Sequence, residues 1–200
     1  MDSKKYFIPG NGDHCERVKI KGFVSLEFYQ KGKLVHEDHN PNIILNQGKA
    51  EVIESLTSGT NRILARMCIG DRGALPSDPT VPKTPEASRT SLYAEVYRQD
   101  VDITSTTTDG DVNEILLVST FKALDIPLSA YSDQTNPVVS EIGLVMIDQI
   151  TGDPLPRPPV AAPNLPDSDE AVFAMRTYKT VPFEAANETA VTVRYTIFIG

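Results

Sequence analysis

Residues 65–79, ARMCIGDRGALPSDP, place two glycines, an aspartate and an arginine directly after an apolar run. Glycines that follow a strand are typical of loops whose backbone N–H groups bind phosphate, which would indicate a nucleotide-binding enzyme. Such a loop also needs a lysine and a following helix. Here Gly70 is followed by Asp71, Arg72 and Gly73, and then by prolines. The stretch therefore predicts a strand that ends in a surface turn.

Histidines and carboxylates occur together in the stretch HEDH, which contains His36 and His39. On a strand these two imidazoles point to opposite faces, so one metal ion could reach both only at a turn. His14 next to Cys15 has no second pair of ligands at zinc spacing. The chain also contains no G-x-S-x-G motif and no cysteine–histidine signature of a protease. We predict no catalytic, cofactor-binding or metal site, and hence a protein that is not an enzyme.

The composition of the 200 residues is ordinary for a globular domain, with 40% hydrophobic and 23% charged residues. The net charge of −8 argues against a nucleic-acid-binding protein, because binding phosphates broadly requires clustered lysine and arginine. No apolar run approaches the ~20 residues needed to cross a bilayer, so no membrane partner is expected. The only cysteines are Cys15 and Cys68. We favour two reduced thiols, and a disulfide bridge between the two cysteines is the alternative.

The elements that must position any site are mainly strands. A two-residue alternation of apolar and polar side chains predicts a hairpin over residues 17–45, with its turn at QKGK. The stretch 46–59 predicts the one helix, capped by Asn46 and ended by Gly59. Its stripe of Ala50, Ile53 and Leu56 is expected to pack on a sheet.

Further strands are predicted at 62–70, 92–104, 113–124, 138–148 and 189–200. The stretch STTTDGD should join the second and third of these, and 113–124, apolar on both faces, should lie between two layers. Residues 71–91 are expected to form a loop, and six prolines between 154 and 166 exclude a central strand there. The prediction is a mainly β fold: an antiparallel β-sandwich-like domain with one short α-helix and long extended loops. It comprises an N-terminal arm, 1–16, and a single β-rich domain, 17–200, with a proline-rich insertion at 149–170.

Short motifs spread over residues 20–200 resemble, in their order, structural proteins of tailed bacteriophages of the tail-collar-fibre, neck and baseplate kind. The matching residues are Asn46, Gly48, Gly70, Asp71, Leu92, Glu95, Tyr97, Arg98, Glu141, Ile142, Gly143, Leu144, Arg176, Lys179, Val193, Tyr195 and Ile197. Three of them, Glu95, Arg98 and Glu141, could form charge-assisted hydrogen bonds that fix strand register, or could be exposed charges of little energetic value.

The resemblance implies a non-enzymatic structural component of a virion, in the tail, the collar or neck, or the baseplate. It would be assembled in the host cytoplasm and would join neighbouring subunits, as a homo-oligomer and with other virion proteins. The long insertion and the end at Gly200 favour a collar, neck or baseplate component over a fibre. Residues 1–16 and 149–170 are expected to contact other chains. One alternative is a receptor- or carbohydrate-binding β-module of a tail fibre, with Tyr131 as the candidate loop aromatic. Another is a hydrolase of cell-wall polymer.

Overall fold

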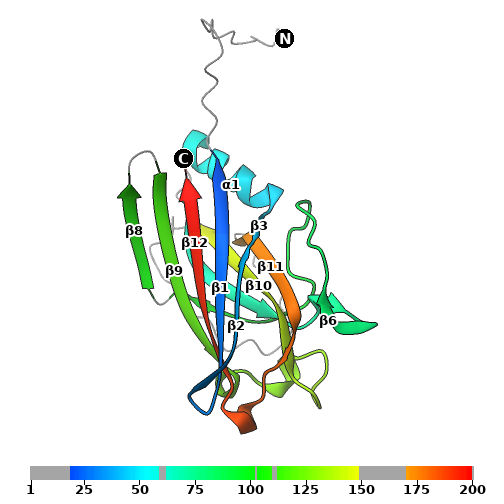
Figure 1. Ribbon diagram of the computed structural model, residues 1–200. Coiled ribbons are helices and arrows are strands. Elements are labelled where there is room, and N and C mark those ends of the chain that lie inside the picture. Colours follow the sequence, from blue (N-terminus) through cyan, green and yellow to red (C-terminus); the bar gives the residue numbers. More distant parts are fainter. Residues whose placement is uncertain (1–18, 59–61, 102, 110–111, 149–169, 200) are drawn as a thin grey trace, which may run out of the picture.

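The structure, a computed structural model, describes residues 19–58, 62–101, 103–109, 112–148 and 170–199 (Figure 1). The predicted arm 1–16 lies outside the described residues, as does the predicted insertion 149–170 except for Glu170. Two five-stranded antiparallel sheets and one α-helix account for most of the described chain. The predicted mainly β, sandwich-like fold with one helix is therefore confirmed.

The first sheet, sheet A, is built around the C-terminal strand, whose alternating valines, tyrosine and isoleucine make it a typical half-buried strand. Its strand order is β2-β1-β12-β9-β8. The strands are β1 (Ile20–Gln30), β2 (Lys33–Pro41), β8 (Ile103–Asp109), β9 (Val112–Lys122) and β12 (Ala190–Ile199). Lys31 and Gly32 both have positive φ between β1 and β2, as a tight hairpin turn requires, so the predicted hairpin turn is confirmed.

The second sheet, sheet B, has the strand order β3-β11-β10-β4-β7. Its strands are β3 (Ile43–Ile44), β4 (Arg62–Gly70), β7 (Glu95–Asp100), β10 (Val138–Asp148) and β11 (Glu170–Pro182). The chain passes from one sheet to the other at Asn42, between β2 and β3, and again after Asp100, between β7 and β8. The strand predicted over 92–104 is therefore wrong, because its residues belong to two strands in two sheets. Most of the predicted connection STTTDGD belongs to β8.

Side chains from the inner faces of both sheets form the main core, which includes Phe28, Tyr195, Leu144 and Phe121. A second apolar cluster lies on the other face of sheet B; it consists of Leu45, Cys68, Leu92, Val145, Val172 and Met175. Sheet B is therefore buried on both faces, and its central strand β10 is buried without interruption from Val139 to Met146, with Ser140 and Glu141 among the buried residues. The prediction that 113–124 lies between two layers is wrong: β9 belongs to sheet A, and its Leu116 and Val118 are only half-buried.

The helix α1 (Asn46–Ser58) packs against β11. Gly48 makes the close approach possible, because a Cβ there would lie 2.6 Å from the Cα atom of Phe173. The predicted packing face is wrong: Ile53 and Leu56 are 62% and 82% exposed. Val52 packs on the core instead. The close contact between Gly48 and the backbone of Phe173 thus determines the orientation of this short helix. The predicted apolar stripe does not determine it.

The predicted loop 71–91 contains a small two-stranded sheet, β5 (Ala74–Leu75) and β6 (Asp78–Pro82). This correction has a simple reason: β5 has only two residues and β6 is exposed throughout, so neither strand carries an apolar alternation. β6 lies against β11, where the Thr177 hydroxyl donates a hydrogen bond of 2.5 Å to the Lys83 carbonyl. The segment is thereby held on the outer face of sheet B.

Candidate functional site

The most deeply buried carboxylate is that of Glu141 on β10, which has no exposed surface. Its oxygens accept hydrogen bonds from the backbone N–H groups of Tyr93 at 2.7 Å, Ala94 at 2.8 Å and Arg72 at 3.4 Å. One side chain therefore binds both ends of the segment between β4 and β7. We call Glu141 with its three backbone donors the Glu141 junction.

Two glycines make room for this junction. A Cβ on Gly70 would lie 2.3 Å from the Ala94 carbonyl oxygen and 2.5 Å from a carboxylate oxygen of Glu141. A Cβ on Gly73 would lie 2.2 Å from the Ser140 carbonyl oxygen. In the stretch that first suggested a phosphate loop, Gly70 is thus needed for close approach to the carboxylate of Glu141, and Gly73 for close approach to the backbone of β10. The prediction of a strand end and turn is confirmed.

Burial raises the pKa of Glu141, although the three N–H donors and the charge of Arg89 act in the opposite direction. A raised pKa in a carboxyl group is often the mark of a general acid. Here the carboxyl group accepts hydrogen bonds from three backbone N–H groups and has no exposed surface. We interpret Glu141 as a structural group that holds a long loop on sheet B.

Glu95 and Arg98 on β7 form a second buried polar contact. The Arg98 guanidinium donates to both carboxylate oxygens of Glu95, with 2.7 Å between Nη2 and Oε2. The side chain of Arg98 is 2% exposed and that of Glu95 is 15% exposed. The sequence left open whether these residues and Glu141 form charge-assisted hydrogen bonds or are exposed charges, and the structure supports the first alternative.

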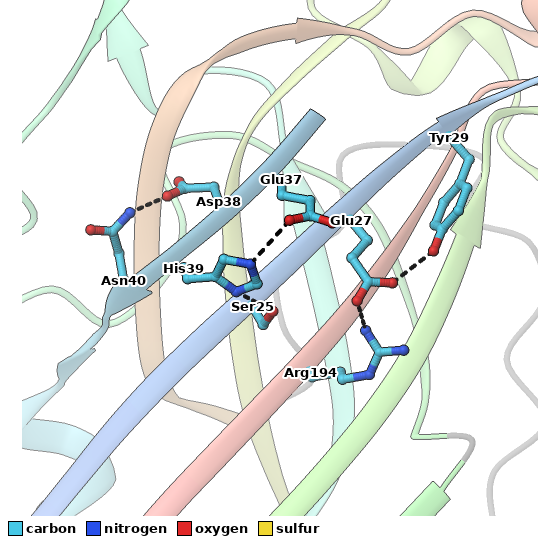
Figure 2. Close-up of polar contacts among 8 residues, drawn as sticks. All are labelled: Ser25, Glu27, Tyr29, Glu37, Asp38, His39, Asn40 and Arg194. Atoms are coloured by element: carbon cyan, nitrogen blue, oxygen red, sulfur yellow. Dashed lines mark hydrogen bonds and ion pairs between the residues drawn. The ribbon is translucent and has the colours of Figure 1, made fainter. Parts of the chain in front are cut away.

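A larger polar network covers the outer face of sheet A (Figure 2). Glu27 on β1 accepts hydrogen bonds from the Tyr29 hydroxyl, at 2.7 Å, and from Arg194 on β12. The hydrogen bond from Tyr29, together with the charge of Arg194, lowers the pKa of Glu27. The Arg194 contact connects β1 with its neighbour β12, which is the usual role of cross-strand charge pairs, and the Tyr29 contact lies within β1.

In a separate set of contacts on this face, Ser25, His39 and Glu37 lie in the order of a catalytic triad (Figure 2). Ser25 Oγ is 2.6 Å from Nδ1 of His39, and Nε2 of His39 is 3.5 Å from a carboxylate oxygen of Glu37. Sequence reasoning missed this set, because the residues meet only through the register that places Ser25 opposite His39. The available signal was Glu37 and His39 at alternate positions of the second predicted strand, which place both side chains on one face.

The surroundings do not suit a hydrolase. The side chains of His39 and Glu37 are 60% and 48% exposed, whereas a triad needs a carboxylate that holds the imidazole in a dry site. An oxyanion hole needs free backbone N–H groups. Ser25 lies on β1, which is paired with β2 on one side and β12 on the other. We interpret the network as a set of surface contacts between strands.

Replacing Ser25 with alanine should therefore leave hydrolysis of p-nitrophenyl acetate at the rate of the wild-type protein. The free energy of unfolding should change by less than about 1 kcal/mol, as expected for exposed polar pairs. A tenfold drop in the hydrolysis rate of the variant would contradict this interpretation. His39→Ala serves as the second variant, because a triad would lose its activity with either residue.

His36 and His39 occupy opposite faces of β2, as predicted. The ring of His36 stacks on Phe28 with 5.7 Å between the ring centroids, and burial lowers the pKa of His36. His14 and Cys15 lie outside the described residues, and Cys68 is a buried free cysteine. Within the described ranges no three His, Cys, Asp or Glu side chains come close enough to hold a metal ion.

A hollow of about 540 Å³ lies between the start of β1, the β2–β3 connection and the start of α1. Ile20, Phe23 and Ile43 provide apolar walls, and Lys21 and Lys49 add two positive charges. The hollow can receive an apolar group with an anionic neighbour. It offers no carboxylate or imidazole for catalysis among its lining residues.

Tyr131, the predicted loop aromatic of a carbohydrate-binding module, is not presented to solvent. The residue is only 4% exposed and belongs to the main core. Burial, ahead of the charge of Asp71, raises the pKa of its hydroxyl. The ring therefore offers no stacking surface for a sugar.

The fold and these polar clusters define an antiparallel β-sandwich whose described ionisable groups mainly connect strands and loops. Comparisons with protein-family models, with curated protein sequences and with solved structures find no match for this chain. None of the helices in the described part of the chain is long and apolar enough to span a membrane.

Proposed function

We propose that the chain is a non-enzymatic structural component of a tailed-bacteriophage virion, in the tail, the collar or neck, or the baseplate. The observation that supports this proposal is the Glu141 junction. Gly70, Glu141 and Ala94, the residue before Glu95, lie in three separate motifs that resemble phage structural proteins, and they meet in one buried contact. The motifs therefore serve to build a scaffold, which is what a structural role requires.

The polar residues that could do chemistry fit the same role. The carboxylate of Glu141 accepts hydrogen bonds from the loop between β4 and β7, and that of Glu27 accepts one from Arg194 on the neighbouring strand β12. The carboxylate of Glu95 accepts from Arg98 of its own strand. A rigid sandwich with long connections suits a subunit that is repeated in a larger assembly. The proposal includes homo-oligomerisation and contact with other virion proteins.

The direct test uses the phage genome that encodes the chain. A stop codon early in the gene should give particles that lack part of the tail, neck or baseplate in negative-stain electron microscopy. Mass spectrometry of purified wild-type particles should detect the chain. Its absence from purified particles, with normal infectivity of the mutant, would contradict the proposal.

The role of the proline-rich segment can be tested separately. Ile147 lies opposite Glu170 in the antiparallel pair β10–β11. An Asn-Gly turn in place of residues 148–169 should therefore close a two-residue hairpin and leave the sandwich intact. We expect the purified variant to keep the circular dichroism spectrum and melting temperature of the wild type, but to fail to complement the stop-codon mutant. Normal complementation would show that the segment is not needed for assembly.

A further inference from the structure

The two sheets have four edge strands, and on two of these, β2 and β7, a side chain of the opposite sheet donates a hydrogen bond to a backbone carbonyl near one end. On β2, Arg176 of β11 donates to the Pro41 carbonyl at 2.9 Å and pairs with Asp38 at 3.4 Å. On β7, Gln99 donates to the Thr120 carbonyl of β9 at 2.9 Å, and the Asp100 carbonyl accepts from Ser119 at 3.2 Å. β3 is only two residues long.

The fourth edge, β8, differs from these. Its seven residues pair with β9 in continuous register, from Ile103 opposite Val118 to Asp109 opposite Val112. Within the described residues, no hydrogen bond reaches the side of its backbone that faces away from β9. Ser105 to Thr108 are all exposed, and β8 forms one side of the molecule in Figure 1.

The sequence of β8, ITSTTTD, has none of the features that usually prevent edge-to-edge pairing. Natural edge strands carry lysine, proline, a bulge or an inward-pointing charge. β8 has no proline, no lysine and no bulge, and its first charged residue is Asp109 at the end. By contrast β2 begins with Lys33, ends with Pro41 and has a register shift against β1.

We propose that β8 pairs with β8 of a second copy, antiparallel and about a twofold axis at Thr106. The sequence of β8 favours a second copy as the pairing partner, because β8 is self-complementary in this antiparallel register. Ser105 then lies opposite the partner subunit's Thr107, and Asp109 lies opposite the partner subunit's Ile103. Hydroxyl-bearing pairs of this kind stabilise antiparallel strands. Sheet A already contains one, Thr120 with Thr192 at 3.1 Å.

Charge supports the same choice. The chain carries a net charge of −8, so most faces of two copies repel each other. Between Ile103 and Thr108 the edge is neutral, and no like charges lie directly opposite one another in this register. Pairing would satisfy the free backbone groups and join two five-stranded sheets into one. The inference concerns self-association only and does not rest on the virion proposal.

Disulfide trapping tests both the pairing and its register. In a Cys15→Ser background, Thr106→Cys places the two thiols on directly opposite residues, whose Cα atoms are ~4.5–5.5 Å apart in antiparallel pairs. Mild oxidation should convert most of this variant to a covalent dimer on a non-reducing gel. The matched control is Thr108→Cys. In this register its two copies are about four residues, or ~13 Å, apart, beyond disulfide reach. It should stay monomeric.

Equal cross-linking of the two variants, or none in either, would overturn the proposal. A second measurement avoids the cysteines. Sedimentation equilibrium of the wild-type protein should show a monomer–dimer equilibrium. Thr106→Lys, which places two positive charges opposite each other, should weaken the dimer at least tenfold while keeping the wild-type melting temperature. The inference would also be refuted if the wild-type protein stayed monomeric at a concentration of ~1 mM, which is high enough to detect a dimer of millimolar affinity.

Discussion

Glu141→Ala is expected to lower the free energy of unfolding by at least about 3 kcal/mol, because it removes the only side chain at the Glu141 junction. The N–H groups of Tyr93 and Ala94 would lose hydrogen bonds of 2.7 and 2.8 Å. Each buried donor left without a partner costs about 1–3 kcal/mol. The lost carboxymethyl group also leaves a cavity behind β10.

Urea denaturation followed by circular dichroism measures this loss. Glu37→Ala is the matched control, because the Glu37 side chain is 48% exposed and pairs only at the surface. It should cost no more than about 1 kcal/mol. Equal losses in the two variants would show that Glu141 does not organise the loop.

Glu141 also makes a prediction about pH. Because burial raises its pKa, the folded protein holds the proton more tightly than the unfolded chain does. Its contribution to stability is therefore complete below the ordinary value of 4.5 and is lost as the pH rises through the folded pKa. Glu141→Gln has the same volume but does not titrate.

The stability difference between the wild type and Glu141→Gln should therefore be most favourable to the wild type at acid pH and should shrink towards neutral pH. Denaturation series at several pH values between about 3 and 8 would measure it, since this range brackets an ordinary and a raised carboxyl pKa. A difference that grows with pH would mean that the backbone donors outweigh burial.

Much of the fold follows from local pattern. β12 has buried Val191, Val193, Tyr195 and Ile197, as the alternation predicts. The hairpin of β1 and β2 was equally readable, because its turn residues accept positive φ. Patterns of this kind depend only on neighbours in the sequence, so they need no knowledge of the rest of the chain.

The predictions that proved wrong concern features that are determined by contacts between segments far apart in the sequence. Periodicity could not show that Gly48 would contact Phe173 and so turn Ile53 and Leu56 towards solvent. Nor could it show that the chain changes sheets after Asp100, because the strand pattern continues across the crossing. The sequence showed the three segments of the Glu141 junction only as motifs in a given order. It did not show that they come into contact. Their meeting point depends on the pairing of β10 with β4 and of β4 with β7.

Gly70→Ala is expected to be among the most damaging single-methyl additions in the described chain. The new Cβ would lie 2.3 Å from the Ala94 carbonyl oxygen and 2.5 Å from Glu141. Neither neighbour can move freely, since Ala94 donates to Glu141 and Asp71 donates to the Ala94 carbonyl at 3.1 Å. Overpacking a fixed site costs about 1–3 kcal/mol, and breaking the junction adds to this.

Gly32→Ala separates steric clash from backbone strain. Gly32 has a φ of +73°, but no atom lies within 4 Å of a Cβ built there. Only the left-handed backbone is then penalised, at about 1–2 kcal/mol. Gly70 has no positive φ, so its cost is purely one of space. Denaturant titration should therefore give a larger loss for Gly70→Ala than for Gly32→Ala. The reverse order would mean that the loop between β4 and β7 can move away from Glu141, so that the carboxylate does not hold it in place.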